Sequence, residues 1–478
     1  MRIVYIHPEG YQKRYSEVVI PVGMVGIMNM LLDYGYDVTA VNIPLEMRLN
    51  EEFDTLAYFR ENKYDVYMVE LHWYIYSYHA IELSKYIKSI NPDSTIVLGG
   101  MTATKYNIDI MKNYDFVDFI ISGDSENSYI AFLSEMEKDK RYYDVCNLTF
   151  RSGNRIIENQ VECISKEQFD KMNYSNYSWL NNKDYFFRLQ AHEDLLHDGT
   201  ESRLAWLPIA RGCMYDCSYC GGNKTFFEKE FNYNSYKIRS IDSVIFDMQQ
   251  LKSIGVNKIG VTHDLSIFGN AYWKELFDRI EENDFNFSIF HYCFQLPCAE
   301  FIKRMNNVFS QDGSVVGIPV ITGDEEKRRL NGKLFFNRDL LETLDAFIGS
   351  KTIVSLYFID NAVGCEGSTF EKTKEFIIAL VDRYSKHINL EVGYGFELLQ
   401  PASKVYRGEF EKDGIMPLWT SFNDIYQRLS PQFQTTLHRE RNMEMILGQT
   451  TSDRNLLFRY KHFNRLIEEK GLNYIKEV

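Results

Sequence analysis

Three cysteines within eight residues constrain this chain more than any other feature of its sequence. Cys213, Cys217 and Cys220 have the spacing CxxxCxxC, which lets three thiolates converge on one small object without much backbone strain. Gly221 and Gly222 follow at once, and their lack of a side chain permits close approach of the backbone. A closed structural zinc site or a fully ligated iron–sulfur cluster has four protein ligands. Three ligands therefore predict a metal site with one open position.

The spacing alone leaves two alternatives open. One is a zinc site whose fourth ligand lies elsewhere, with Cys293, Cys298, His263 and His291 as candidates; the other is a set of three buried thiols. The position of the motif favours the open metal site. An apolar run at 204–210, which is typical of a buried strand, precedes the cysteines, and strand and helix patterns alternate after them. In parallel α/β folds, active-site residues gather on the loops that follow the strands.

At this motif the chain resembles the radical SAM superfamily. The match is CxxxCxxC with an aromatic residue, Tyr219, immediately before the last cysteine. The resemblance implies that the three thiolates hold a [4Fe-4S] cluster whose open iron binds S-adenosylmethionine, and that the reduced cluster cleaves this cofactor to a 5′-deoxyadenosyl radical. It also implies a partial, TIM-like (β/α)6 radical SAM barrel at about 200–400 and an electron donor such as a flavodoxin or a ferredoxin.

Composition limits the other classes of function. A chain of 478 residues with 45% hydrophobic residues predicts two or three domains. No apolar stretch has the length of a transmembrane helix, and residues 1–7 resemble a first strand rather than a signal peptide, so we expect no membrane partner. Five scattered cysteines beside the trio do not form a disulfide framework, which favours the cytoplasm. The net charge of −14 makes nucleic acid an unlikely partner.

The first domain is expected at residues 1–140, where short apolar runs alternate with helical patterns. Expected strands are 2–7, 37–43, 65–71, 95–98 and 119–122, and expected helices are 19–34 and 79–90. Regular alternation of this kind predicts a doubly wound, Rossmann-like parallel sheet. Ligands of such sheets lie at the carboxyl ends of the strands.

This segment is similar to the cobalamin (B12)-binding domain that precedes the radical SAM domain in a large subfamily. The resemblance rests on three stretches, which are Pro21-Val22-Gly23, Leu98-Gly99-Gly100-Met101-Thr102-Ala103-Thr104 and Gly123-Asp124-Ser125-Glu126. It implies that Gly99, Gly100 and Gly123 bind cobalamin, because a corrin ring and its nucleotide tail need close backbone approach.

His7 is the candidate lower ligand of cobalt. Many cobalamin proteins carry Asp-x-His-x-x-Gly after the first strand, and this chain has Tyr5-Ile6-His7-Pro8-Glu9-Gly10. The aspartate that would orient the imidazole is Tyr5 here. The alternatives are a strand-end histidine satisfied by local hydrogen bonds, cobalamin bound without any protein histidine, or a domain that binds no cobalamin.

Three further segments complete the expected organisation. Residues 141–199 form a connector with a small hairpin, whose strands are 147–150 and 155–158. In the barrel we expect strands at 258–262, 287–293, 314–322, 353–359 and 390–399, and helices at 240–254, 271–282, 299–309 and 341–348. Residues 401–478 form a helical segment with helices at 421–429 and 450–470, which in relatives shapes the substrate pocket.

Seven further residues between 221 and 321 carry expectations. Asn223 stands where the family often has the acid of Gly-Gly-Glu, so Gly221, Gly222 and Asn223 are expected at the methionine amino group, and Ile321 stands where relatives have a glutamate. Asp264 either meets a ribose hydroxyl or the substrate, or caps a helix. Cys293 lies at the inner rim with Cys298, where a cysteine either donates a hydrogen or binds substrate, or is buried and inert.

Three functions follow from these features. The first is cobalamin-dependent radical SAM methylation of an unactivated carbon in a small-molecule or peptide substrate. The second is another radical SAM reaction, such as cyclisation, rearrangement or epimerisation, with the first domain passive or empty. The third is a non-enzymatic scaffold that binds zinc or a redox group. No pocket residue in the sequence identifies the substrate.

Overall fold

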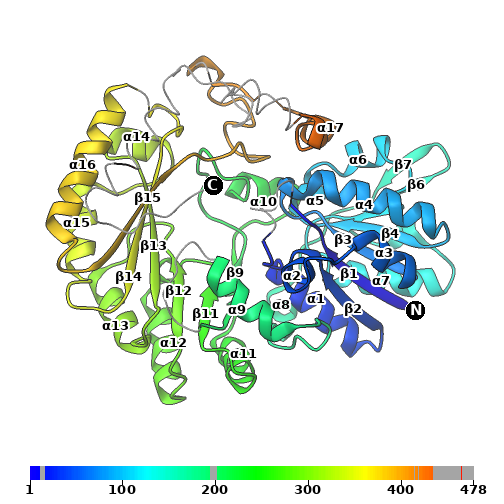
Figure 1. The fold of residues 1–478 in the computed structure, drawn as a ribbon, viewed down its shortest axis with the longest axis horizontal. Helices are drawn as coiled ribbons and strands as arrows, with labels where there is room; N and C mark the ends of the chain where they lie inside the picture. Colours follow the sequence, from blue (N-terminus) through cyan, green and yellow to red (C-terminus); the bar gives the residue numbers. More distant parts are fainter. Residues whose placement is uncertain are drawn as a thin grey trace. The chain divides into compact units, whose positions relative to one another are not determined.

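The computed structural model describes residues 1–10, 17–193, 202–365, 367–413, 415–417, 419–433 and 465. Within these residues the chain forms two compact units (Figure 1). Unit 1 comprises residues 1–186, 221–236 and the segment that starts at 419, and unit 2 comprises 187–220 and 237–418. The helix expected at 450–470 lies outside the described residues, apart from position 465.

Unit 1 is built on one seven-stranded sheet with the order β2-β1-β3-β4-β5-β6-β7. The strands are β1 (Arg2–His7), β2 (Asp37–Asn42), β3 (Val66–Glu70), β4 (Thr95–Gly99), β5 (Phe119–Ile121), β6 (Leu148–Ser152) and β7 (Arg155–Glu158). The first five are parallel, and the hairpin β6–β7 adds antiparallel to the edge at β5. The expected doubly wound sheet and hairpin are thereby confirmed. The strand order reverses at β1, so ligands are expected where β1 and β3 end.

Helices follow the parallel strands of unit 1, and later parts of the chain add to them. They are α1 (Val22–Asp33), α2 (Ile43–Leu49), α3 (Thr55–Glu61), α4 (Ser77–Ile90), α5 (Met101–Lys105), α6 (Asn107–Asn113), α7 (Glu126–Glu137), α8 (Lys166–Lys171), α10 (Lys224–Glu230) and α17 (Phe422–Arg428). Lys105 pairs with Glu230 of α10 at 2.7 Å, and Tyr426 of α17 donates to Glu82 at 2.6 Å. Residues far apart in the sequence therefore complete unit 1.

Unit 2 is built on a six-stranded parallel sheet whose strands are neighbours in chain order. They are β8 (Leu204–Leu207), β11 (Lys258–Val261), β12 (Ser288–Tyr292), β13 (Val315–Ile321), β14 (Ile353–Ile359) and β15 (Asn389–Gly395). The helices are α9 (Lys183–Glu193, which begins in unit 1), α11 (Ile241–Ser253), α12 (Asn270–Glu282), α13 (Ala299–Val308), α14 (Glu325–Leu330), α15 (Asn337–Asp345) and α16 (Ser368–Tyr384). No pairing joins β8 to β15 within the described residues. Unit 2 is therefore the expected open, six-stranded β/α barrel.

The last strand of the barrel is shorter than the expected 390–399. It ends at Gly395 because the next backbone groups bond to a side chain instead of to β14. Glu397 donates its N–H to Asn361 Oδ1 at 2.8 Å, and Asn361 Nδ2 donates to the Glu397 carbonyl at 2.7 Å. The chain after Gly395 thereby becomes a loop at the carboxyl edge of the barrel.

Two further differences from the expectations concern helices. Helix α15 (Asn337–Asp345) begins four residues before the expected 341, and α14 and α16 were not expected. In α15 the polar residues Asn337 and Arg338 occupy the first turn, so an apolar pattern alone sets its start too late.

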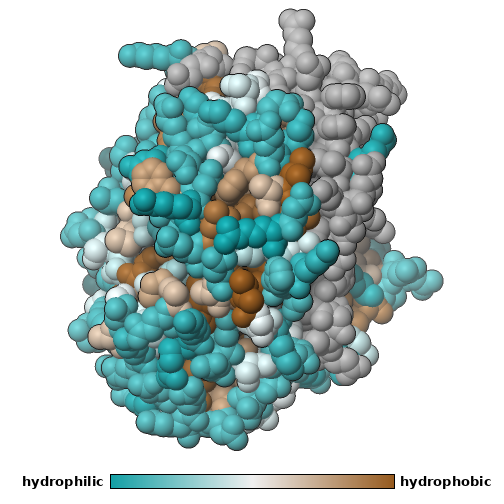
Figure 2. Space-filling model, turned by 90° about the vertical axis from the view of Figure 1, so that its left-hand side faces the viewer, coloured by the Kyte–Doolittle hydropathy of each residue, from teal (hydrophilic) through white to brown (hydrophobic). Residues whose placement is uncertain are grey.

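The surface shown in Figure 2 is mostly hydrophilic, and its hydrophobic residues form small separate groups. Among the described residues, no helix combines the length and hydrophobicity needed to cross a membrane.

Candidate functional site

The three cysteines lie on the loop that leaves the first barrel strand. Short strands β9 (Ala210–Arg211) and β10 (Lys237–Ile238) pair antiparallel on either side of the loop segment. None of the three cysteines is in a disulfide; Cys217 is 8% exposed, and Cys213 and Cys220 are half-buried. Burial raises the pKa of the Cys213 thiol, and Tyr215 donates its N–H to Cys213 Sγ at 3.4 Å. Such N–H···S bonds also tune iron–sulfur clusters.

A segment after α14, Asn331–Lys333, fastens this loop. Ser218 Oγ donates to Asn331 Oδ1, and the same oxygen accepts the N–H of Val363 at 3.1 Å. Gly332 has a φ of +91°, and a Cβ there would lie 3.0 Å from both the Cα and the Sγ of Cys217. The sequence analysis missed this segment, although the Asn331-Gly332 dipeptide is a turn signal.

Lys333 brings a buried cation to the same place. The residue is only 4% exposed, and its Nζ donates to the Phe294 carbonyl at 2.9 Å. Burial lowers the pKa of Lys333, while the charges of the three cysteines act in the opposite direction. The arrangement places one ammonium group beside three thiols.

Tyr219 packs on an apolar wall formed by Ile321, Ala362 and Cys365. Ile321 has a φ of +70° and is fully buried where β13 ends, next to a bulge in its pairing with β14. A β-branched residue is rare in the left-handed region, and such strain concentrates at functional sites. The position that carries a glutamate in relatives thus supplies an apolar surface beside Tyr219.

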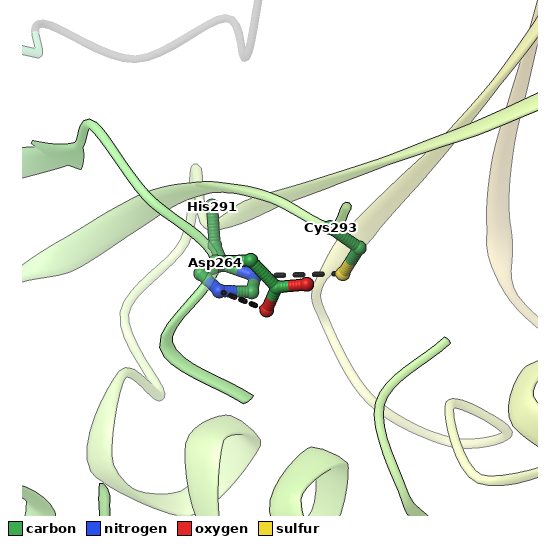
Figure 3. Close-up of side chains that lie close together, drawn as sticks. All are labelled: Asp264, His291 and Cys293. Atoms are coloured by element: carbon green, nitrogen blue, oxygen red, sulfur yellow. Dashed lines mark hydrogen bonds and ion pairs between the residues drawn. The ribbon is translucent and has the colours of Figure 1, made fainter. Parts of the chain in front are cut away.

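Asp264, His291 and Cys293 form a buried group at the carboxyl ends of β11 and β12 (Figure 3). Asp264 is the N-cap of the 3₁₀ helix η4 (Leu265–Phe268): Oδ1 accepts from Ser266 N at 2.9 Å, and Oδ2 accepts from Phe294 N at 2.7 Å. Burial alone would raise the pKa of Asp264, but hydrogen bonds to the carboxylate hold it below its usual value. The structure therefore shows the capping arrangement that was one of the two expectations.

His291 and Cys293, the other two residues of this group, also have partners within the protein. His291 Nε2 lies 3.0 Å from Leu265 N and 3.4 Å from Asp264 Oδ1, and Nδ1 lies 3.6 Å from Cys293 Sγ. Burial raises the pKa of the Cys293 thiol well above its usual value, so the thiol stays protonated. The ligand atoms of the three residues lie within 4.8 Å of one another, but each side chain already contacts a partner within the protein, which disfavours a metal ion there.

The remaining candidates for a fourth zinc ligand lie apart from this group. His263 Nε2 faces the Gly212 carbonyl at 2.8 Å, and burial lowers the pKa of His263. Cys298 is exposed at the start of α13. The alternative of a buried, inert Cys298 is therefore wrong, because this cysteine is exposed at the N-cap of α13.

In unit 1, His7 is fully buried where β1 ends, between two acceptors. Nδ1 lies 2.6 Å from Glu70 Oε2, which also accepts from Tyr5 OH, and Nε2 lies 2.8 Å from the Glu17 carbonyl. Burial alone would lower the pKa of His7, but the Glu70 carboxylate raises it above its usual value. Glu70, from β3, thus takes the orienting role that the sequence analysis found missing at Tyr5, while both ring nitrogens donate within the protein.

The three glycines expected at cobalamin are required by packing within unit 1. Gly100 has a φ of +109°, and a Cβ there would lie 2.6 Å from His72 Cα. At Gly99 a Cβ would approach Tyr129 OH to 3.2 Å, and Gly123 has a φ of +65°. These contacts favour glycine at the three positions, and their expected contact with cobalamin stays a prediction.

Three buried polar groups near the carboxyl ends of β3 and β5 have no hydrogen-bond partner in the part of the chain that the structure describes. They are the hydroxyls of Ser77 and Ser122 and Oε1 of Glu70. Such groups call for a ligand or ordered water. Glu70 ends β3, Ser77 follows β3 and Ser122 follows β5. The carboxyl edge of the unit 1 sheet therefore fits a polar ligand.

The residues that follow Cys220 belong to unit 1. Asn223 is 1% exposed and is the N-cap of α10, where Oδ1 accepts from Phe226 N at 3.0 Å. A Cβ at Gly222 would lie 3.3 Å from Met101 Cε. Gly221, Gly222 and Asn223 are therefore held by α10 and α5, and their expected contact with S-adenosylmethionine stays a prediction.

The comparisons with known proteins agree with this organisation. Residues 13–133 match the family model of the B12 binding domain. The anaerobic magnesium-protoporphyrin IX monomethyl ester cyclase of Synechocystis sp. is 25% identical over 240 residues, covering 46% of this chain and 42% of that protein. The hopanoid C-3 methylase of Methylococcus capsulatus is 21% identical over 266 residues, covering 54% and 45%. The matches thus span less than half of each relative.

A solved structure shares the fold. The radical S-adenosylmethionine methyltransferase TsrM from Kitasatospora setae, solved with a tryptophan substrate and an S-adenosylmethionine analogue, matches with a TM-score of 0.65 at 14% identity. The match covers 86% of this chain and 77% of TsrM. The expected fold and the expected B12 binding domain are both confirmed.

Proposed function

We propose that this chain, which carries a B12 binding domain and the fold of a radical SAM enzyme, catalyses cobalamin-dependent methylation of an unactivated substrate carbon. The observation that carries the proposal is the set of three cysteines, none of them in a disulfide, on one loop after β8, held by the segment at 331–333. Soft thiolates suit iron–sulfur clusters. When bound, the cluster with S-adenosylmethionine supplies a carbon radical, and cobalamin supplies methyl-transfer chemistry.

The chain's own residues bind and shield these groups. Cys213, Cys217 and Cys220 would hold the cluster, and the apolar wall at Tyr219 and Ile321 would exclude water from the radical chemistry. In unit 1, Ser77 and Ser122 would donate hydrogen bonds to the polar periphery of cobalamin.

The surroundings of His7 support cobalamin binding without this histidine on cobalt. Both ring nitrogens already face acceptors, Glu70 and the Glu17 carbonyl. A histidine that binds a metal needs a free lone pair on the imidazole. The raised pKa of His7 disfavours loss of the proton that occupies this lone pair.

Anaerobic reconstitution tests the proposal. The chain is loaded with iron, sulfide and hydroxocobalamin and given S-adenosylmethionine and a strong reductant. We expect a brown protein with about four irons, and mass spectrometry should detect both 5′-deoxyadenosine and S-adenosylhomocysteine. The variants Cys213→Ala, Cys217→Ala and Cys220→Ala should lose the colour and both products. A colourless, zinc-loaded wild-type protein would instead support the scaffold function.

A second candidate is a radical reaction without methyl transfer. The relative named as a cyclase supports it, because that printed activity is no methylation. This candidate gives 5′-deoxyadenosine without S-adenosylhomocysteine, and no transfer from methyl-labelled S-adenosylmethionine to cobalamin. Replacing the chemical reductant with a flavodoxin or a ferredoxin tests the proposed electron donor in the same assay.

A further inference from the structure

Lys333 is a buried cation that forms no ion pair within the described part of the chain. The residue is 4% exposed, and Nζ donates to a neutral acceptor, the Phe294 carbonyl. Among the described residues no carboxylate forms an ion pair with Nζ, and Asp264 is the carboxylate whose charge acts on it from further away and raises its pKa. A buried ammonium group is costly unless a negative group compensates it. The position therefore calls for a negative group closer to Nζ than the Asp264 carboxylate.

The backbone around Lys333 fixes this cation beside the cysteines. Gly332, the preceding residue, packs against Cys217. A Cβ added at Gly332 would lie 3.0 Å from both the Cα and the Sγ of Cys217. Gln295 brackets the lysine: its Nε2 donates to the Gly332 carbonyl at 3.0 Å, and its Oε1 accepts from Leu334 N at 2.8 Å. The backbone is thus tied on both sides of Lys333, and the bond from Nζ to the Phe294 carbonyl holds the ammonium group.

A cluster held by Cys213, Cys217 and Cys220 supplies the missing negative charge. Three thiolates outweigh the positive charge of an oxidised [4Fe-4S] core, and reduction adds one more electron. Charges interact strongly where water is excluded, so a fixed cation favours the reduced state over the oxidised one. We infer that Lys333 is a built-in countercharge that raises the reduction potential of the cluster and so makes its one-electron reduction accessible.

The inference rests on the proposed cluster, and measuring its potential tests it. Lys333→Met removes the charge at similar length, and Lys333→Arg keeps it. Lys404→Met is the matched control, because Lys404 lies 3.6 Å from Asp216 of the same loop but both side chains are partly exposed and screened by water. Midpoint potentials come from redox titration of the reconstituted full chain followed by electron paramagnetic resonance.

We expect Lys333→Met to lower the equilibrium constant for cluster reduction at least tenfold, which is about 59 mV for one electron. Lys333→Arg and Lys404→Met should stay within about threefold of wild type. If Lys333→Met binds no cluster, restored loading in Lys333→Arg supports the countercharge, and no loading in either variant overturns it. An unchanged potential in Lys333→Met, or equal shifts in Met and Arg, also overturns it. Absence of iron in the wild-type protein would refute the proposed function itself.

Discussion

At the residue scale, Gly332 and Gly349 make a matched pair. Both have left-handed backbone, with φ values of +91° and +81°, and alanine in that region costs about 1 kcal/mol. An added Cβ at Gly349 meets nothing within 4 Å, whereas at Gly332 it meets Cys217. We expect Gly332→Ala to lose a further ~1–3 kcal/mol of unfolding free energy and to bind less iron than Gly349→Ala. Urea titration of the apo protein and iron analysis measure the two effects, and equal losses would contradict the role of Gly332.

The same site shows what a sequence reveals about single residues. The three cysteines could be recognised from the sequence because they lie within eight residues, so their spacing alone indicates shared chemistry. Ser218 and Asn331 are 113 positions apart, and no local pattern links them. Glu70 was missed as the partner of His7 for the same reason, because it comes from a different strand, 63 positions away.

At the element scale, β15 carries a strongly perturbed carboxyl group. Glu391 is 8% exposed, and Oε2 has no hydrogen-bond partner among the residues described. Burial raises its pKa to about 7, although Lys258 acts to lower it. Because the folded state then binds a proton that the unfolded chain releases, this group makes stability fall as pH rises between about 4.5 and 7.

The variant Glu391→Gln tests this dependence, because the amide imitates the neutral acid. Above pH 7 we expect the variant to be more stable than wild type by about 2 kcal/mol, and near pH 4 we expect the difference to vanish. Urea unfolding curves across this range measure it. Glu275→Gln, on the exposed side of α12, is the control, with an expected change below about 0.5 kcal/mol at every pH. Parallel curves for wild type and Glu391→Gln would contradict the prediction.

Elements were predictable from the sequence where a local signal marks them. Ser240 and Gly255 bound α11 as expected: the Ser240 hydroxyl accepts from Ser243 N, and Gly255 has a φ of +84°. The end of β15 was set wrongly because the residues after Gly395 remain apolar in pattern, and only the side chain of Asn361 stops the ladder. A side-chain competitor from another loop has no signature in the strand itself.

At the scale of the whole molecule, α17 completes unit 1 from the far end of the chain. Phe422 is fully buried against the rings of Tyr106 and Tyr114, and its N–H donates to Asp109 at 2.6 Å. We expect Phe422→Ala to lower the unfolding free energy of unit 1 by about 3 kcal/mol. Phe246→Ala, at a position 51% exposed on α11, should cost under about 0.5 kcal/mol. Differential scanning calorimetry compares the two, and equal effects would refute the structural role of α17.

The alternation of strands and helices was enough to predict both sheets and their order along the chain. It was not enough to assign residues 221–236 and α17 to unit 1. An apolar stripe on a helix predicts that one face is buried, but it does not say which sheet covers that face. The sequence therefore indicates the architecture more completely than the partners of its late segments.

The late arrival of α17 has a consequence for biosynthesis. Translation delivers the amino-terminal sheet first, yet the surface around Tyr106 and Tyr114 waits for residues beyond 418 before it is covered. Until the ribosome has made the segment that contains α17, that nascent sheet stays unfinished and exposes aromatic side chains to chaperones and to aggregation.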